Sequence, residues 1–316
     1  MRAAAALWIT LAAAASEYSA EELHRLSDRN AHGAAIDGSR VITWGDAVVA
    51  WPLDGSAPVT LARAAGGFGE GGCAFGDGLV LHELPARMVF LRRSGAIELI
   101  DTAADFRDCL DVTLFGRRGV LVVHRGAQVR FYESPHWRYR EIYSIYTPSR
   151  QGGLLLRDVD GDRRPDILCG NYWIRSPERF DLPWRLFAIQ DWWEREESAL
   201  VRLAFSGALL AAQSEAAPAR LAWFDRPADP KLPWNRREVE VSPPPRRVRA
   251  LAPGSAPGTA IAGEDAGPGS RLLRIEGRRA EVIGAGDGFV AARVSGGDIV
   301  TVSRSAIVRW RPQRRR

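Results

Sequence analysis

The chain has 316 residues, 46% of them hydrophobic, and its formal net charge at pH 7 is +5. This length suits one large all-β domain or two ordinary domains, and the hydrophobic content is normal for a globular protein with a sizeable core. The positive charge is almost all arginine, with Lys231 as the single lysine and a basic tail at Arg309–Arg316. We interpret the tail as a solvated end, with contact to an anionic polymer or lipid as the alternative, and expect no nucleic-acid partner.

The first 15 residues have the features of a secretory signal peptide. A positive charge at Arg2 precedes an apolar run, and small residues precede Ser16. The run is too short to span a bilayer as a permanent helix. The sequence therefore predicts a signal peptide at residues 1–15 and a mature protein, residues 16–316, that is secreted or periplasmic without an integral membrane span. A membrane anchor or an ordinary apolar helix at the N-terminus is the alternative.

Short apolar runs separated by glycine, proline and polar residues follow one another through the mature chain, as expected for β-strands. Seven units can be aligned on one apolar anchor each, and neighbouring anchors are 37 to 50 residues apart. The anchors are Trp51, Phe90, Phe131, Trp173, Trp223, Leu273 and Trp310. Two units match closely, because Trp184 and Trp234 also recur at one repeat position, where we expect packing residues. Such units need neighbours to bury their faces, so they predict a repeat array.

The last unit lacks a final strand, because the six residues after Trp310 are too few and too basic to form one. The segment Glu21–Leu26 has a strand-like sequence and no partner of its own. We expect it to complete the last unit and to leave no exposed sheet edge. The proline-rich stretches 242–247 and 252–258 are interpreted as loops, with a division into two domains as the alternative.

Three cysteines, Cys73, Cys109 and Cys169, lie beside strand-like apolar residues. Their number is odd, and their spacing matches neither a zinc site nor a close redox pair. We interpret all three as small buried core residues.

A short acidic loop lies between two apolar runs in the middle of the chain. Its carboxylates stand at positions 1, 3, 5 and 9, namely Asp158, Asp160, Asp162 and Asp166, and position 7 is Arg164. Calcium takes six to eight oxygen ligands, which such a loop offers from alternate side chains and from the main-chain oxygen at position 7. Four carboxylates this close repel one another without a cation. The loop predicts a calcium site, with a solvated acidic turn as the alternative.

The pattern Asp158-x-Asp-Gly-Asp-x-x-x-Asp166, followed by Ile167-Leu168 and Gly170–Trp173, resembles the FG-GAP/VCBS repeat of integrin-type β-propellers. The resemblance covers residues 129–241 best, and it implies a propeller blade whose first turn holds calcium. Arg163 departs from it, because the family usually has glycine there. A left-handed conformation at arginine costs about 1 kcal/mol.

Two adjacent tryptophans, Trp192 and Trp193, follow an expected outer strand. Neighbouring residues of a strand face opposite sides, and exposed aromatic faces stack on sugars or anchor protein interfaces. We predict a ligand-binding role for this pair. Coverage of a seam between blades is the alternative.

Catalytic signatures are scarce. The sequence contains no glycine-rich phosphate loop, no Gly-x-Ser-x-Gly nucleophile motif and no histidine pair at metal-binding helical spacing, so no catalytic residue is predicted. Loops from distant blades converge in a propeller, and the alternative is a polysaccharide lyase or other carbohydrate-active enzyme. Its candidate residues are His136, Arg138 and Tyr139, or His82 and Arg87.

Together these features predict an all-β, seven-bladed β-propeller closed by an N-terminal strand, with the calcium loop in the fourth blade. The expected function is non-catalytic binding of a protein or carbohydrate by a secreted, calcium-stabilised monomer.

Overall fold

The structure is a computed structural model that describes residues 17–27, 31–102, 105–124, 128–144, 152–189, 202–213 and 218–313, without the side chain of Arg107. The secondary structure of this described part consists of strands. It contains no helix long and apolar enough to cross a membrane.

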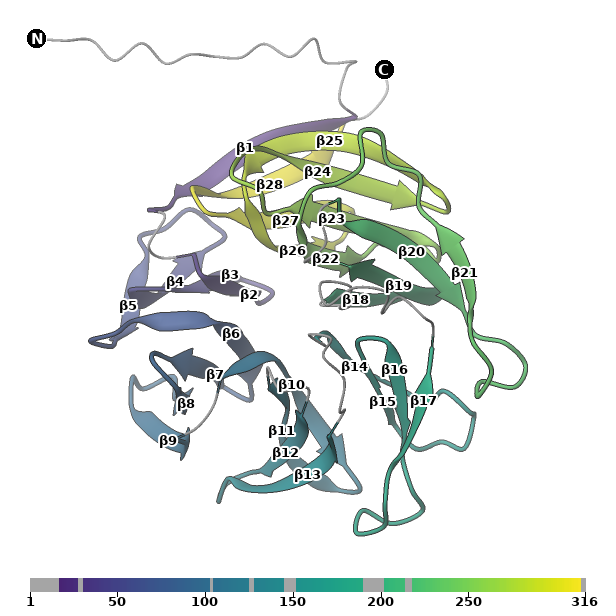
Figure 1. Cartoon of the computed structure of the whole chain (residues 1–316). Coiled ribbons are helices and arrows are strands. Elements are labelled where there is room, and N and C mark those ends of the chain that lie inside the picture. Colours follow the sequence, from purple (N-terminus) through teal and green to yellow (C-terminus); the bar gives the residue numbers. More distant parts are fainter. Residues whose placement is uncertain are drawn as a thin grey trace, which may run out of the picture.

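Seven four-stranded antiparallel sheets form a ring of blades (Figure 1). Blade 1 contains β2 (Gly33–Ile36), β3 (Arg40–Trp44), β4 (Ala47–Pro52) and β5 (Val59–Arg63). Blade 2 contains β6 (Phe68–Phe75), β7 (Gly78–Glu83), β8 (Arg87–Leu91) and β9 (Ile97–Asp101). Blade 3 contains β10 (Phe106–Leu114), β11 (Arg117–His124), β12 (Gln128–Glu133) and β13 (Arg138–Ser144).

The remaining blades follow in chain order. Blade 4 contains β14 (Leu154–Arg157), β15 (Asp166–Cys169), β16 (Tyr172–Arg175) and β17 (Arg185–Ala188). Blade 5 contains β18 (Arg202–Ser206), β19 (Ala208–Gln213), β20 (Arg220–Asp225) and β21 (Asn235–Glu238). Blade 6 contains β22 (Val248–Pro253), β23 (Thr259–Glu264), β24 (Pro268–Glu276) and β25 (Arg279–Asp287), and blade 7 contains β26 (Phe289–Ser295), β27 (Asp298–Ser303), β28 (Ala306–Pro312) and β1 (Tyr18–Arg25).

Each blade begins with its innermost strand. In blades 1 to 6 the four strands then run outward in chain order, whereas in blade 7 the N-terminal strand β1 lies outside β26, β27 and β28 (Figure 1). Because every blade repeats this order around the ring, the innermost strands all run in the same direction. We call the face where they begin the upper face and the face where they end the lower face. The first turn of every blade and the third turn of blades 1 to 6 therefore lie on the lower face.

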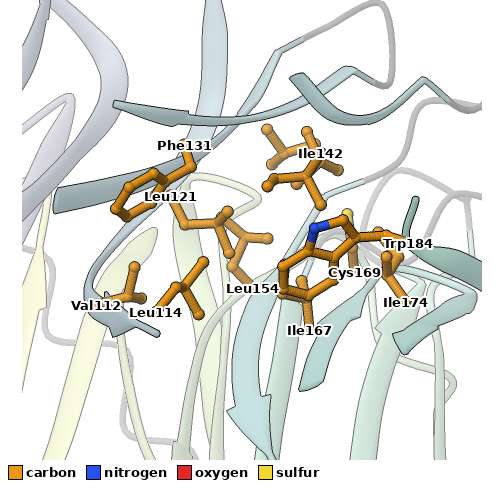
Figure 2. Close-up of a cluster of buried hydrophobic side chains, with 12 residues drawn as sticks. Val112, Leu114, Leu121, Phe131, Ile142, Leu154, Ile167, Cys169, Ile174 and Trp184 are labelled. Carbon is orange, nitrogen blue, oxygen red and sulfur yellow. The ribbon is translucent and has the colours of Figure 1, made fainter. Parts of the chain in front are cut away.

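The hydrophobic core is divided among the seams between blades. Each of the seven main clusters joins side chains of two neighbouring blades, and blades 7 and 1 are joined in the same way. Figure 2 shows the seam of blades 3 and 4, where Leu121 and Phe131 face Leu154, Ile167 and the indole of Trp184. The seven predicted anchors all lie on the third strand of their blade and are at most 9% exposed. This arrangement confirms the seven-bladed propeller.

The ring closes through the N-terminal strand. Strand β1 pairs antiparallel with β28, with Tyr18 opposite Pro312 and Arg25 opposite Ala306. This pairing confirms that the segment around Glu21–Leu26 supplies the last strand of blade 7.

A disulfide corrects the interpretation of the cysteines. Cys73 on β6 and Cys109 on β10 are bonded, with their Cα atoms 5.6 Å apart, so they link the innermost strands of blades 2 and 3. Only Cys169 is a free buried cysteine, as predicted. The two bonded residues are 36 positions apart, close to one repeat, and this spacing was the sequence signal for equivalent strands of neighbouring blades.

Candidate functional site

The acidic loop joins β14 to β15 on the lower face of blade 4. The carboxylates of Asp158, Asp160 and Asp166 each place an oxygen within 4.8 Å of the others. Asp166 is fully buried, whereas Asp158 is exposed. Three hard oxygen donors converging at this distance suit a divalent cation such as calcium or magnesium.

The backbone of the loop has the left-handed turns that its pattern requires. The φ angles are 83° at Gly161 and 66° at Arg163, which confirms that the arginine adopts the strained conformation expected there. Asp158 accepts hydrogen bonds from the N–H groups of Gly161 at 2.8 Å and Arg163 at 2.9 Å. These bonds hold the first carboxylate over the loop.

Asp166 ties the loop to the end of the neighbouring strand. It accepts hydrogen bonds from the N–H of Val159 at 3.1 Å and from the N–H and hydroxyl of Ser176 at 2.8 and 3.1 Å. Burial raises the pKa of Asp166, although these hydrogen bonds act in the opposite direction. A cation beside the buried carboxylate would offset the cost of its desolvation, so the residues fit a metal.

Two arginines supply positive charge to Asp160 and Asp162. Arg175 Nε donates to Asp160 Oδ2, and the guanidinium of Arg164 donates to Asp162. Arg175 Nη2 also lies 3.7 Å from Asp162 Oδ2. The structure therefore directs Asp162 toward arginines and outside the three-carboxylate cluster. Ligation by Asp162 and by the main-chain oxygen of Arg164 stays a prediction.

A groove of about 550 Å³ lies on the same lower face, between blades 3 and 4. One wall comes from the turns of blade 3 and the other from the segment that follows Ser176 in blade 4. Its lining includes Phe115, Arg138, Tyr139, Glu178 and Phe180. Because Ser176 donates hydrogen bonds to Asp166, the acidic loop positions the start of the blade 4 wall.

The groove combines aromatic rings with charged groups. The ring of Phe180 lies 5.5 Å from that of Phe131, and the guanidinium carbons of Arg117 and Arg140 lie 5.3 and 5.1 Å from its centroid. Tyr139 is 54% exposed. An exposed phenol ring beside guanidinium and carboxylate groups can both stack on a ligand and form hydrogen bonds with it.

The two alternative sets of enzyme candidates lie in different places. Arg138 and Tyr139 line the groove on the lower face, and the exposed His136 lies in the adjoining turn. His82 and Arg87 lie near the turn between β7 and β8 on the upper face. The His82 ring is buried 3.9 Å from Asp105, and Arg87 forms an ion pair with Glu83 at 3.2 Å. The two sets therefore lie on opposite faces of the ring.

The predicted ligand-binding pair, Trp192 and Trp193, lies outside the described residues, between β17 and β18. The other repeated tryptophans are placed. Trp184 and Trp234 are 5% and 6% exposed and pack in the seams of blades 3–4 and 4–5, which confirms their packing role.

A charged cluster on the upper face was missed in the sequence. The guanidinium of the buried Arg249 donates to the main-chain oxygen of His32, and its Nη1 lies 3.4 Å from both Glu70 and Asp265. Arg304 donates to Asp265 at 3.0 Å. Burial lowers the pKa of Arg249 to about 10. Blades 1, 2, 6 and 7 contribute these residues, so the cluster links them across the ring.

The strand order and the seams define the class of this protein as a seven-bladed β-propeller. No known protein family matches the sequence, so membership of the FG-GAP/VCBS family is not confirmed. No curated protein matches it either.

Solved structures resemble the fold at low sequence identity. A streptogramin B lyase superposes with a TM-score of 0.64 at 10% identity, covering 94% of this chain and 98% of its own. BamB from Moraxella catarrhalis gives 0.54 at 11% identity, covering 88% and 84%. Sqt1 from Saccharomyces cerevisiae gives 0.55 at 9% identity, covering 90% and 97%. At these identities the likeness shows the fold alone.

Proposed function

We propose that this chain is an exported, calcium-stabilised β-propeller that binds a protein or carbohydrate, without catalysis, in the groove between blades 3 and 4. The observation that carries the proposal is the set of hydrogen bonds that links the acidic loop to the start of the blade 4 wall of the groove. Asp166 accepts a hydrogen bond from Ser176, and Asp160 accepts one from Arg175. The lining of the groove in blade 4 begins shortly after these two residues, at Glu178.

Calcium would act at this junction. Asp158, Asp160 and Asp166 would hold the ion, which supplies positive charge to carboxylates that otherwise repel one another. An ion present at about 100 times its dissociation constant adds roughly 2.7 kcal/mol to the free energy of unfolding. The same ion would keep the blade 4 wall in place.

Export is supported by two independent features. The first 15 residues have the pattern of a signal peptide, and a disulfide joins Cys73 to Cys109. Disulfides persist in oxidising compartments and are rare in the cytosol. Calcium is also abundant outside the cytoplasm, where sites with dissociation constants of about 10⁻⁴–10⁻³ M fill.

The groove is tested with the mature protein, residues 16–316, on glycan and protein arrays in calcium. The affinity for the captured ligand is then measured by calorimetry for the wild-type protein and for the variants Tyr139→Ala and Arg138→Gln, whose substituted residues both line the groove. We expect each variant to weaken binding at least tenfold. The matched control is Leu232→Ala, because Leu232 is about as exposed as Tyr139 and lies in the third turn of blade 5, away from the groove.

Unchanged affinity in both groove variants would contradict the proposed site. The same incubations are examined for shortened glycans. Cleavage products would contradict the non-catalytic assignment and favour the carbohydrate-active enzyme instead.

A further inference from the structure

A second cavity, of about 310 Å³, lies on the lower face in the seam between blades 1 and 2. Its floor is apolar and is built from the strands of these two blades. Ile42, Leu79 and Leu91 are 7%, 2% and 2% exposed and form this floor, and the half-buried Leu61 and the exposed Ala74 also line the cavity. The cavity lies in a different seam from the groove and from the acidic loop.

The rim of this cavity carries more positive than negative charge. Four arginines and two aspartates line it, namely Arg40, Arg92, Arg93, Arg293, Asp37 and Asp77. Arg40 lies 3.6 Å from Asp37, and Arg92 lies 2.7 Å from Glu98.

The other two arginines form no ion pair with a carboxylate of the described residues. Arg293 Nη1 donates to the main-chain oxygen of Ile36 at 2.7 Å, and Arg93 is exposed. A bond to a carbonyl leaves the charge of the guanidinium uncompensated. Arg93 comes from blade 2 and Arg293 from blade 7, so they approach the apolar floor from different blades.

From this combination we infer a binding site for a small molecule with an apolar body and one carboxylate head. The planar guanidinium matches a carboxylate with two parallel hydrogen bonds, and the floor removes an apolar chain from water. The volume falls at the lower end of small-molecule pockets, roughly 300–1,000 Å³, so the cavity suits a compact ligand rather than a polymer.

Octanoate is the probe, and octan-1-ol is its matched control, because the two share an alkyl chain and differ in the charged head. Titration calorimetry with the full mature chain measures both. We expect saturable octanoate binding that weakens as salt is raised, and at least tenfold weaker binding of octan-1-ol. Equal affinity for the two probes, or no saturable octanoate binding, overturns the inference.

Variants distinguish the contribution of the ligand's carboxylate head from that of its alkyl chain. Arg93→Gln and Arg293→Gln should each weaken octanoate binding about tenfold and leave octan-1-ol binding unchanged. Ala74→Phe should fill the cavity and weaken both probes. The control is Arg278→Gln, an exposed arginine of blade 6 that pairs with Glu240. Melting curves confirm that each variant is folded, and full octanoate affinity in both folded Arg93 and Arg293 variants overturns the inference.

Discussion

At the scale of single residues, His124 makes the stability of the fold depend on pH. Its ring is 6% exposed at the end of β11, and its Nε2 lies 3.2 Å from the hydroxyl of Tyr132. That hydroxyl donates to Asp101 at 2.8 Å, so His124 Nε2 is the donor to Tyr132. Burial, with a smaller contribution from Arg130, lowers the pKa of His124 from 6.5 to about 4. The folded protein therefore holds the neutral imidazole.

This shift predicts a loss of stability in acid. Between pH 6.5 and 4 the unfolded chain binds a proton at His124 that the folded chain does not, so the free energy of unfolding falls as pH falls. The contribution of His124 between pH 7 and 4.5 is about 2 to 3 kcal/mol. Urea unfolding at both pH values should show a smaller decrease for His124→Gln. An equal decrease in both proteins would show that His124 does not carry the effect.

The convergence of Asp158, Asp160 and Asp166 could be predicted because the acidic pattern of the loop is local in the sequence. The left-handed conformation of Arg163 followed from the same pattern. Arg249 could not be recognised, because its partners His32, Glu70 and Asp265 come from distant parts of the chain. Only the closed ring brings these groups together.

At the scale of strands, the anchors identified the third strand of every blade because an apolar residue recurs once in each repeat. The disulfide link between β6 and β10 was less visible. The sequence showed three cysteines, and the odd number concealed one bonded pair and one free thiol. The groove was also unpredictable, since Tyr139 and Phe180 come from different blades and line the same groove only because the ring brings blades 3 and 4 side by side.

The disulfide should stabilise the two strands that it joins. Cross-linking a loop of this length reduces the entropy of the unfolded chain, which corresponds to about 2 to 4 kcal/mol of stability. We expect the double variant Cys73→Ser/Cys109→Ser to lose this amount in chemical unfolding. A reducing agent should destabilise the wild-type protein and leave the double variant unchanged. Equal sensitivity of the two proteins to reductant would contradict the stabilising role.

At the scale of the whole molecule, strand β1 makes the ring continuous. It covers the edge of β28, and Tyr18 packs against the seam of blades 6 and 7. Deletion of residues 17–27 should therefore abolish cooperative thermal unfolding, because the last blade loses its outer strand and exposes an unpaired edge. Calorimetry of the truncated protein checks this. A melting transition identical to that of the intact protein would contradict closure by β1.

The proposed calcium site would connect the loop, the groove and the stability of the ring, and it is tested most directly by thermal melting of the mature protein in calcium and in excess chelator. Asp158→Asn is the matched variant, because Asp158 forms no ion pair with the described residues. The amide keeps only one of the two oxygens that accept hydrogen bonds from backbone N–H groups, so each protein is compared with itself in calcium and in chelator. We predict a higher melting temperature in calcium for the wild-type protein and a much smaller shift for Asp158→Asn. The same melting temperature with and without calcium in the wild-type protein would contradict the proposed metal site.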